Sequence, residues 1–188
     1  MGKWIVLVVI AAAAIYVIGV FNRLVRLRNL AREGWSGIDV QLKRRTDLVP
    51  NLVEAVKGYA AHERGVFDEV TAMRTSSIAA NNVSAQASAE QGLQASLGKL
   101  FAVAEAYPEL KADKNFLALQ QQLADIEDQL QMARRYYNGT VRNLNTAIQS
   151  FPTNVLAGTF GFHEQPFFEL DDRSQAAAPS VAFQASGS

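Results

Sequence analysis

Adjacent residues His62 and Glu63 are the part of this 188-residue sequence that comes nearest to a catalytic motif. In a helical zinc protease, a second histidine four residues after the first completes the metal site. Position 66 is valine, and the other histidine, His163, lies far along the chain. We therefore predict no catalytic residue, no metal site and no cofactor. A hydrolase built on His62, Glu63 and a nearby arginine is the alternative that this pair leaves open.

Glu63 falls on the apolar stripe of a predicted helix, in step with Val56 and Val70. An ionised carboxylate in a core is costly unless a cation pairs with it. Four arginines at helical positions could supply that cation: Arg44, Arg45, Arg134 and Arg135. We predict that Glu63 is a buried charge with a structural role.

Other common site chemistries have no support in the residue types. The chain has no cysteine, which excludes disulfides, thiolate metal sites and cysteine nucleophiles. The basic run at 43–45 is short, and the chain beyond residue 32 is acidic, so we expect no nucleic-acid partner. No phosphate-binding loop of the Gly-x-x-x-x-Gly-Lys type is present.

The formal net charge of zero is the sum of two opposite segments. Residues 1–32 contain five of the 18 basic residues and none of the 18 acidic ones, so this segment carries +5. The rest of the chain carries −5. Such a division between a short basic segment and a longer acidic one is typical of a protein whose two parts meet different surroundings.

Residues 4–21 form a run of 18 residues without a charge. As a helix this run is roughly 27 Å long, close to the ~30 Å hydrocarbon thickness of a bilayer. A cleaved signal peptide is disfavoured, because the end of the run has bulky residues where a small-residue cleavage site is required. We predict an uncleaved transmembrane anchor at residues 1–22, and hence the lipid bilayer as a partner.

A basic collar follows the anchor and consists of Arg23, Arg26, Arg28 and Arg32. Only Lys3 and the terminal amine precede the uncharged run at 4–21. The positive-inside rule places the more basic flank in the cytoplasm. We therefore predict a single-pass protein of the cell (inner) membrane, with its N-terminus outside, its main domain in the cytoplasm and its collar facing the headgroups.

Apolar residues recur at steps of three and four along most of the chain, a period typical of helices and coiled coils. A first soluble helix is expected to continue from the anchor through Leu42. We expect Pro50 to interrupt it, because proline lacks the backbone donor, and Asp47 to cap a second helix that runs to Met73.

The small, polar stretch 76–88 predicts a turn, and a third helix is expected at 93–107. A fourth should extend from near Asp113 to Phe151. Asn138-Gly139, ordinarily a turn signal, lies within it without a shift of phase, so we expect an unbroken helix there. Helices with these stripes pack most simply as an elongated antiparallel bundle, an all-α fold continuous with the transmembrane helix.

The chain after Pro152 has a different character. We assign residues 23–170 to the bundle domain and 171–188, which are biased in composition, to a disordered tail. The segment before the tail contains four phenylalanines: Phe160, Phe162, Phe167 and Phe168. They could close the end of the bundle or dock on a partner, and both interpretations stay open.

Four sequence blocks resemble the bacterial LemA family. They are LVRLRNLAREGWSGIDVQLKRRTDLVPNLVEAVKGYAAHE, LFAVAEAYPELKADKNFLALQQQL, ARRYYNGTVRNLNTAIQSFPTNVLAG and GFHEQPFFEL. The resemblance covers roughly residues 24–170 and implies one N-terminal span followed by a helical bundle. It supplies no catalytic residue. Because the family includes a protein of magnetosome membrane formation, it suggests a membrane-organising or scaffolding role by analogy.

The function expected from the sequence is therefore that of a non-enzymatic, membrane-anchored scaffold or interaction protein that organises membrane or protein assemblies. Its expected partners are a second copy of the chain or an unidentified protein, because a shared membrane raises effective concentration. An adaptor that docks through its C-terminal aromatic segment is the alternative.

Overall fold

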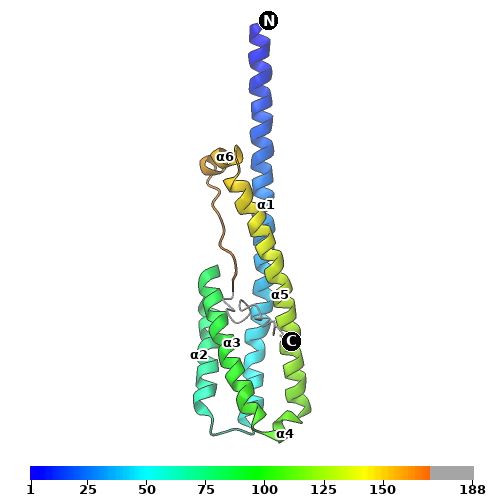
Figure 1. Cartoon of the computed structure of the whole chain (residues 1–188), viewed down its shortest axis with the longest axis vertical. Helices are drawn as coiled ribbons and strands as arrows, with labels where there is room; N and C mark the ends of the chain where they lie inside the picture. The colour runs from blue at the N-terminus through cyan, green and yellow to red at the C-terminus, as the bar shows by residue number, and fades with distance from the viewer. Residues whose placement is uncertain (170–188) are drawn as a thin grey trace, which may run out of the picture.

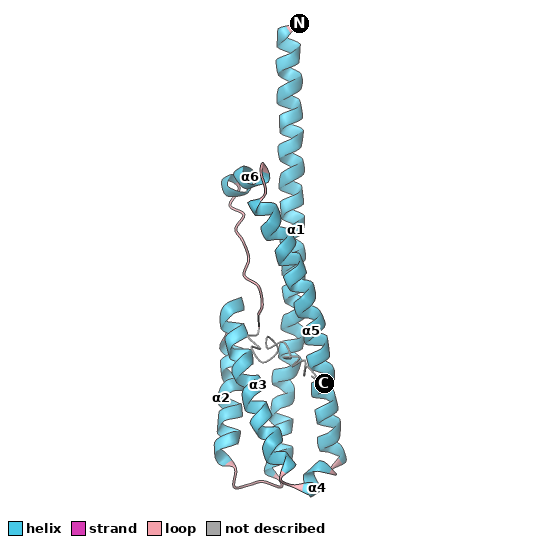
Figure 2. Cartoon of the chain, viewed as in Figure 1, coloured by secondary structure: helices cyan, strands magenta, loops and turns pink. Residues whose placement is uncertain are grey.

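The computed structural model describes residues 1–169, and every regular element among them is a helix (Figure 1, Figure 2). The helices are α1 (Gly2–Lys57), α2 (Arg64–Ala79), α3 (Val83–Glu105), α4 (Pro108–Lys111), α5 (Lys114–Gln149) and α6 (Thr153–Thr159). The predicted all-α fold, with a long N-terminal apolar helix leading into a bundle, is confirmed. The predicted tail at 171–188 lies outside the described residues.

Helices α1, α2, α3 and α5 alternate in direction and form the bundle (Figure 1). Helix α5 packs along α1, helices α2 and α3 form a hairpin beside them, and α4 lies at the base between α3 and α5. The N-terminal part of α1 stands clear of the bundle, and α6 lies beside α1 at the end from which that part emerges. The bundle therefore has one end from which the N-terminal part of α1 emerges, and a base at α4.

Two apolar cores lie one above the other in the bundle. The lower core is built by α1 to α5 and includes Val49, Leu52, Phe67, Leu100 and Phe116. The upper core belongs mainly to α1 and α5, which are joined by side chains from α6 and the segment after it; its members include Leu24, Ile38, Leu144, Ala157 and Phe168. At the level of the lower core the bundle has four helices, and at the level of the upper core the segment after α6 lies beyond the end of the α2–α3 hairpin (Figure 1).

Helices α1 and α5 approach closely at Gly34, which is buried. A Cβ atom at this position would lie 3.0 Å from the Cα atom of Tyr137 and 3.3 Å from the hydroxyl of Thr140. The absence of a side chain at residue 34 therefore sets the distance between the two longest helices.

Helix α1 continues through Pro50, so the predicted break there is wrong. Proline has no N–H group, and the carbonyl of Thr46 consequently loses its intrahelical donor. Arg74 of α2 replaces that donor, because its Nε donates to the Thr46 carbonyl oxygen at 2.7 Å. The carbonyl that Pro50 leaves free is thus used to join two helices.

The real break comes later, at residues 58–63, between α1 and α2. The predicted turn at 76–88 is also too long, since α2 extends to Ala79 and the side chain of Asn82 caps α3 by accepting from the Ala85 N–H. Two other predictions are confirmed. Helix α5 begins near Asp113, whose side chain accepts from the Phe116 N–H, and α5 is unbroken at Asn138-Gly139.

Arg74→Ala should destabilise the fold by about 1–3 kcal/mol, because a partly buried carbonyl loses its donor. The matched background is Pro50→Ala, which restores the helical donor for Thr46. In that background, Arg74→Ala should cost clearly less. The measurement is the free energy of unfolding of the full-length chain in detergent micelles for all four members of the cycle. Equal costs in both backgrounds would contradict the assigned role of Arg74.

Candidate functional site

The N-terminal part of α1 has the exposure expected of a membrane span. Among the described residues, one helix is long and apolar enough to cross a bilayer, and its most apolar 18-residue window has no buried residue. Apolar side chains from Trp4 to Ile18 are exposed on all sides of the helix. A soluble helix of this composition would bury one face, so the predicted membrane association is supported by the structure.

The basic collar lies on α1 just below this apolar run. Arg23, Arg26 and Arg32 are exposed. Arg28 is partly buried, and its guanidinium carbon lies 4.9 Å from the centre of the Phe162 ring. Three of the collar arginines are therefore free to meet lipid headgroups, and the fourth contacts the C-terminal segment.

The prediction that Glu63 is a buried charge is wrong. Glu63 and His62 are both exposed, and Glu63 occupies the N-cap position of α2. The apolar stripe of α1 does not continue through Glu63, because the chain turns at residues 58–63. Within residues 1–169, no group of three or more His, Asp or Glu side chains is placed to hold a metal ion.

The buried charges are instead Arg45 of α1 and Glu90 of α3, which are 1% and 0% exposed. Arg45 Nη1 lies 3.1 Å from Glu90 Oε2, and Arg45 Nη2 lies 3.0 Å from Glu127 Oε1 on α5. Arg45 was among the arginines predicted to pair with a buried acid, and it does so with a different glutamate.

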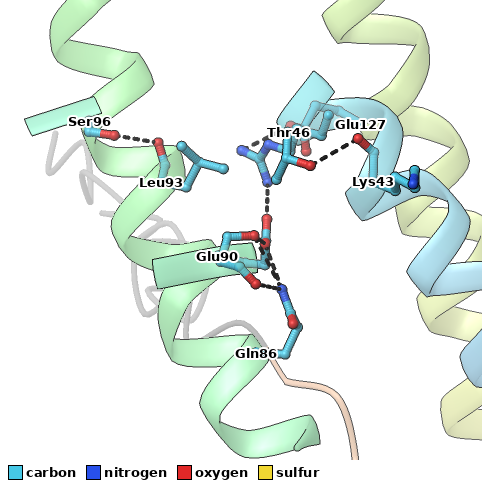
Figure 3. A network of polar contacts seen from close by, with 9 residues as sticks. Lys43, Thr46, Gln86, Glu90, Leu93, Ser96 and Glu127 are labelled. Atoms are coloured by element: carbon cyan, nitrogen blue, oxygen red, sulfur yellow. Dashed lines mark hydrogen bonds and ion pairs between the residues drawn. The ribbon is translucent and has the colours of Figure 1, made fainter. Parts of the chain in front are cut away.

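The second carboxylate oxygen of Glu90, Oε1, also accepts hydrogen bonds. Figure 3 shows the contact between Gln86 and Glu90, both on the helix that faces α1. This oxygen accepts from the hydroxyl of Ser77 on α2 and from Gln86 Nε2 at 2.9 Å. The Gln86 amide also donates to the Ser77 carbonyl at 3.2 Å. All four bundle helices therefore contribute to one polar layer, defined as Arg45, Ser77, Gln86, Glu90 and Glu127.

The polar layer lies between the two apolar cores. On α1, Arg45 falls between Leu42 of the upper core and Leu48 of the lower one, and Glu90 falls in the same way between Ala87 and Leu93. Each buried charge has an opposite partner, which offsets the cost of removing it from water. A one-turn slip of any helix would separate these groups.

Glu127 occupies the edge of the polar layer. Burial raises the pKa of its carboxyl above the ordinary value, an effect larger than the opposing influence of Arg45, and the nearby charge of Glu90 raises that pKa further. The charged groups of the layer pair with one another across α1, α3 and α5, and this ion-pair network fixes the alignment of the helices.

The extended segment, residues 162–169, lies along the upper bundle after α6. Phe162 and Phe168 are buried in the upper core, and the Phe168 ring packs edge-on against Trp35 with 5.6 Å between centres. Phe160 and Phe167 are exposed. The segment therefore packs on its own bundle. Phe162 and Phe168 close the end of the bundle, which is one of the two interpretations left open by the sequence.

Two asparagines of α5 bind the backbone of the extended segment. The side chain of Asn138 donates to the Phe168 carbonyl at 3.1 Å and accepts from the Phe168 N–H at 2.9 Å. Asn145 makes the same pair of hydrogen bonds with Gln165, both at 2.9 Å. Each side-chain amide thus pairs with one backbone N–H and one backbone carbonyl of the extended segment, whose backbone has no neighbouring strand to pair with among the described residues.

The spacing of these contacts follows from geometry. Asn138 and Asn145 are seven residues apart, about 10.5 Å along a helix. Their backbone partners, Phe168 and Gln165, are three residues apart, about 10 Å along an extended chain. The helix and the segment therefore match in length and run in opposite directions. Asn138, whose pairing with Gly139 is ordinarily a turn signal, instead lies within α5 and binds the backbone of the extended segment.

Glu90→Gln should destabilise the full-length chain by about 3 kcal/mol, because it leaves the buried Arg45 with reduced compensation. Glu63→Gln is the matched control at an exposed position and should leave stability unchanged. Denaturant unfolding in detergent micelles followed by circular dichroism gives both values. If the two variants were equally stable, the charge of Glu90 would have no structural role.

Phe168→Ala should cost about 3–5 kcal/mol, because it removes a large buried ring from the upper core. The neighbouring substitution Phe167→Ala removes an exposed ring and should cost less than about 1 kcal/mol. Both are read from the same unfolding measurement. Equal small losses would mean that the extended segment is released from the bundle in solution.

Comparison with known proteins gives a family model and several relatives that match most of the chain. The sequence model of the LemA family matches residues 34–183. The chain is 25% identical over 174 residues to magnetosome protein MamQ of Magnetospirillum gryphiswaldense, a match that covers 79% of this chain and 64% of that protein. The same identity and coverage apply to MamQ 2 of Paramagnetospirillum magneticum.

A further relative is the protein LemA of Metamycoplasma hominis, which is 24% identical over 159 residues, 82% of this chain and 71% of its own length. The matched region thus spans less than two thirds of the MamQ proteins. None of these names describes an enzyme. The family match covers most of the chain and includes both the polar layer and the asparagine contacts, and the protein belongs to the LemA family.

Proposed function

We propose that this protein is a non-enzymatic membrane scaffold: a single-pass anchor whose helical bundle stands on the cytoplasmic face and binds a second copy or another protein. The observation that carries the proposal is the continuity of α1. One helix of 56 residues contains both the exposed apolar run and the bundle helix that bears Arg45. The bundle is therefore attached to its anchor without a flexible linker.

A continuous attachment suits a scaffold better than a tethered enzyme. A domain on a flexible linker can reach substrates in many positions, whereas a domain on a helix is presented at a fixed height. The polar layer uses its charged groups to align helices, which leaves them engaged with one another rather than with a substrate. The names of the MamQ relatives as magnetosome proteins support a place in an assembly.

The proposed orientation rests on charge. The collar arginines follow the apolar run directly, and one lysine precedes it. By the positive-inside rule, the bundle faces the cytoplasm. The sequence beyond residue 32 carries a net charge of −5, which opposes contact with the anionic lipids of that leaflet and leaves the sides of the bundle available to proteins.

Because the chain has no cysteine of its own, a maleimide attached to a single-cysteine variant labels one known position of the protein. We expect a membrane-permeant benzophenone maleimide, attached at Val40→Cys or Met132→Cys in intact cells, to yield covalent dimers or adducts with one partner on illumination. Both positions are exposed on the bundle. The unsubstituted chain is the control. If only monomers were recovered after illumination at native expression, the proposal of a scaffold would be wrong.

The same variants test the orientation. A membrane-impermeant maleimide should modify Gly2→Cys in intact cells and should modify Val40→Cys only after the membrane is opened. Modification of Val40→Cys in intact cells would place the bundle outside and contradict the proposed topology.

A further inference from the structure

The end of the bundle beside the anchor exposes an apolar tip, defined as residues 151–160. Three of its large side chains are exposed: Phe151 by 83%, Val155 by 61% and Phe160 by 44%. Helix α6, which forms most of the tip, buries Thr153 and Ala157 on its inner face. These three exposed apolar side chains lie within ten consecutive residues and form an apolar patch, a feature typical of a surface that contacts something other than water.

The tip lies at the level where the apolar run of α1 ends. The Phe160 ring packs edge-on against Phe21 with 5.1 Å between centres, and Phe21 is the last residue of that run. Figure 1 shows α6 beside α1 at this end of the bundle. A bilayer that contains residues 4–21 would therefore have its surface at the height of the tip.

Charge distinguishes the tip from the opposite end of the molecule. Residues 143–162 contain no charged residue, although they include the end of α5, the whole of α6 and the turn after it. The base connections are charged by contrast, with Lys57, Glu63 and Arg64 in one, and Glu105, Glu109, Lys111, Asp113 and Lys114 in the other. The segment 143–162, which contains the tip, thus has no charged side chain of its own that would oppose entry into lipid.

We propose that the tip inserts Phe151, Val155 and Phe160 into the interfacial region of the same bilayer that α1 spans. The inference rests on the proposed anchoring, and it adds a second lipid contact formed by the domain itself. Aromatic side chains are favoured at the headgroup level, and an apolar face can enter the boundary between headgroups and acyl chains. The occupant of the surface is lipid, because the tip is continuous with the exposed apolar surface of the span at Phe21.

The test uses the full-length chain in vesicles of phosphatidylcholine and phosphatidylglycerol, with an environment-sensitive fluorophore on one introduced cysteine. At Val155→Cys we expect blue-shifted emission and quenching by phosphatidylcholine that carries a nitroxide near the headgroup. Ile78→Cys is the matched control, because Ile78 is 59% exposed and lies beside residues 39–47, at least 18 residues below Phe21 on α1. That label should show neither effect.

Ala12→Cys, in the middle of the apolar run, separates the two proposals. If deep nitroxides quench Ala12→Cys while Val155→Cys behaves like Ile78→Cys, the anchor stands and the lipid contact of the tip is overturned. If Ala12→Cys is not quenched, the anchoring fails, and the tip proposal fails with it.

A charge placed in the tip provides the second variant. Phe151→Asp changes a side chain with few contacts, so the fold should persist, as circular dichroism would verify. In the Val155-labelled chain it should reduce both the blue shift and the quenching, because a carboxylate opposes insertion. Unchanged quenching in this variant would also overturn the proposal.

Discussion

The guanidinium of Arg45 constrains the bundle more than any apolar contact does. A charge that is 1% exposed needs its partners in place at once, and these come from α3 and α5, with Ser77 of α2 completing the shell of Glu90. Apolar side chains tolerate small slips along a helix, because leucine packs against leucine in more than one register. The ion pairs do not, so the two cores are aligned by the layer between them.

Much of the fold could be predicted because it depends on local periodicity. The apolar run, the stripe of α5 and the start of that helix near Asp113 are patterns that neighbouring residues determine. The helix was wrongly predicted to break at Pro50, because the replacement donor, Arg74, lies 28 residues along the chain from Thr46, whose carbonyl it binds. The end of α1 was misplaced because the stripe happens to stay in step across the turn at 58–63, which put Glu63 in a core that it does not reach.

The buried charge had a signal that was overlooked. Glu90 is in step with Leu93, Leu97 and Leu100, but the small residues before it suggested a turn. The pairing of Asn138 and Asn145 with the extended segment had no signal of that kind, because it depends on which segment folds back onto α5. A spacing of seven identifies one helix face, and only the three-dimensional arrangement shows what that face binds.

The unbroken passage of α1 from the apolar run into the base also makes it a mechanical lever. From Phe21 to Lys57 the helix extends for about 54 Å. A change of about 20° in the tilt of the span, within the range that membrane helices adopt, would swing the base sideways by about 18 Å. A change of tilt that accommodates a difference in bilayer thickness would thereby move the base of the domain sideways.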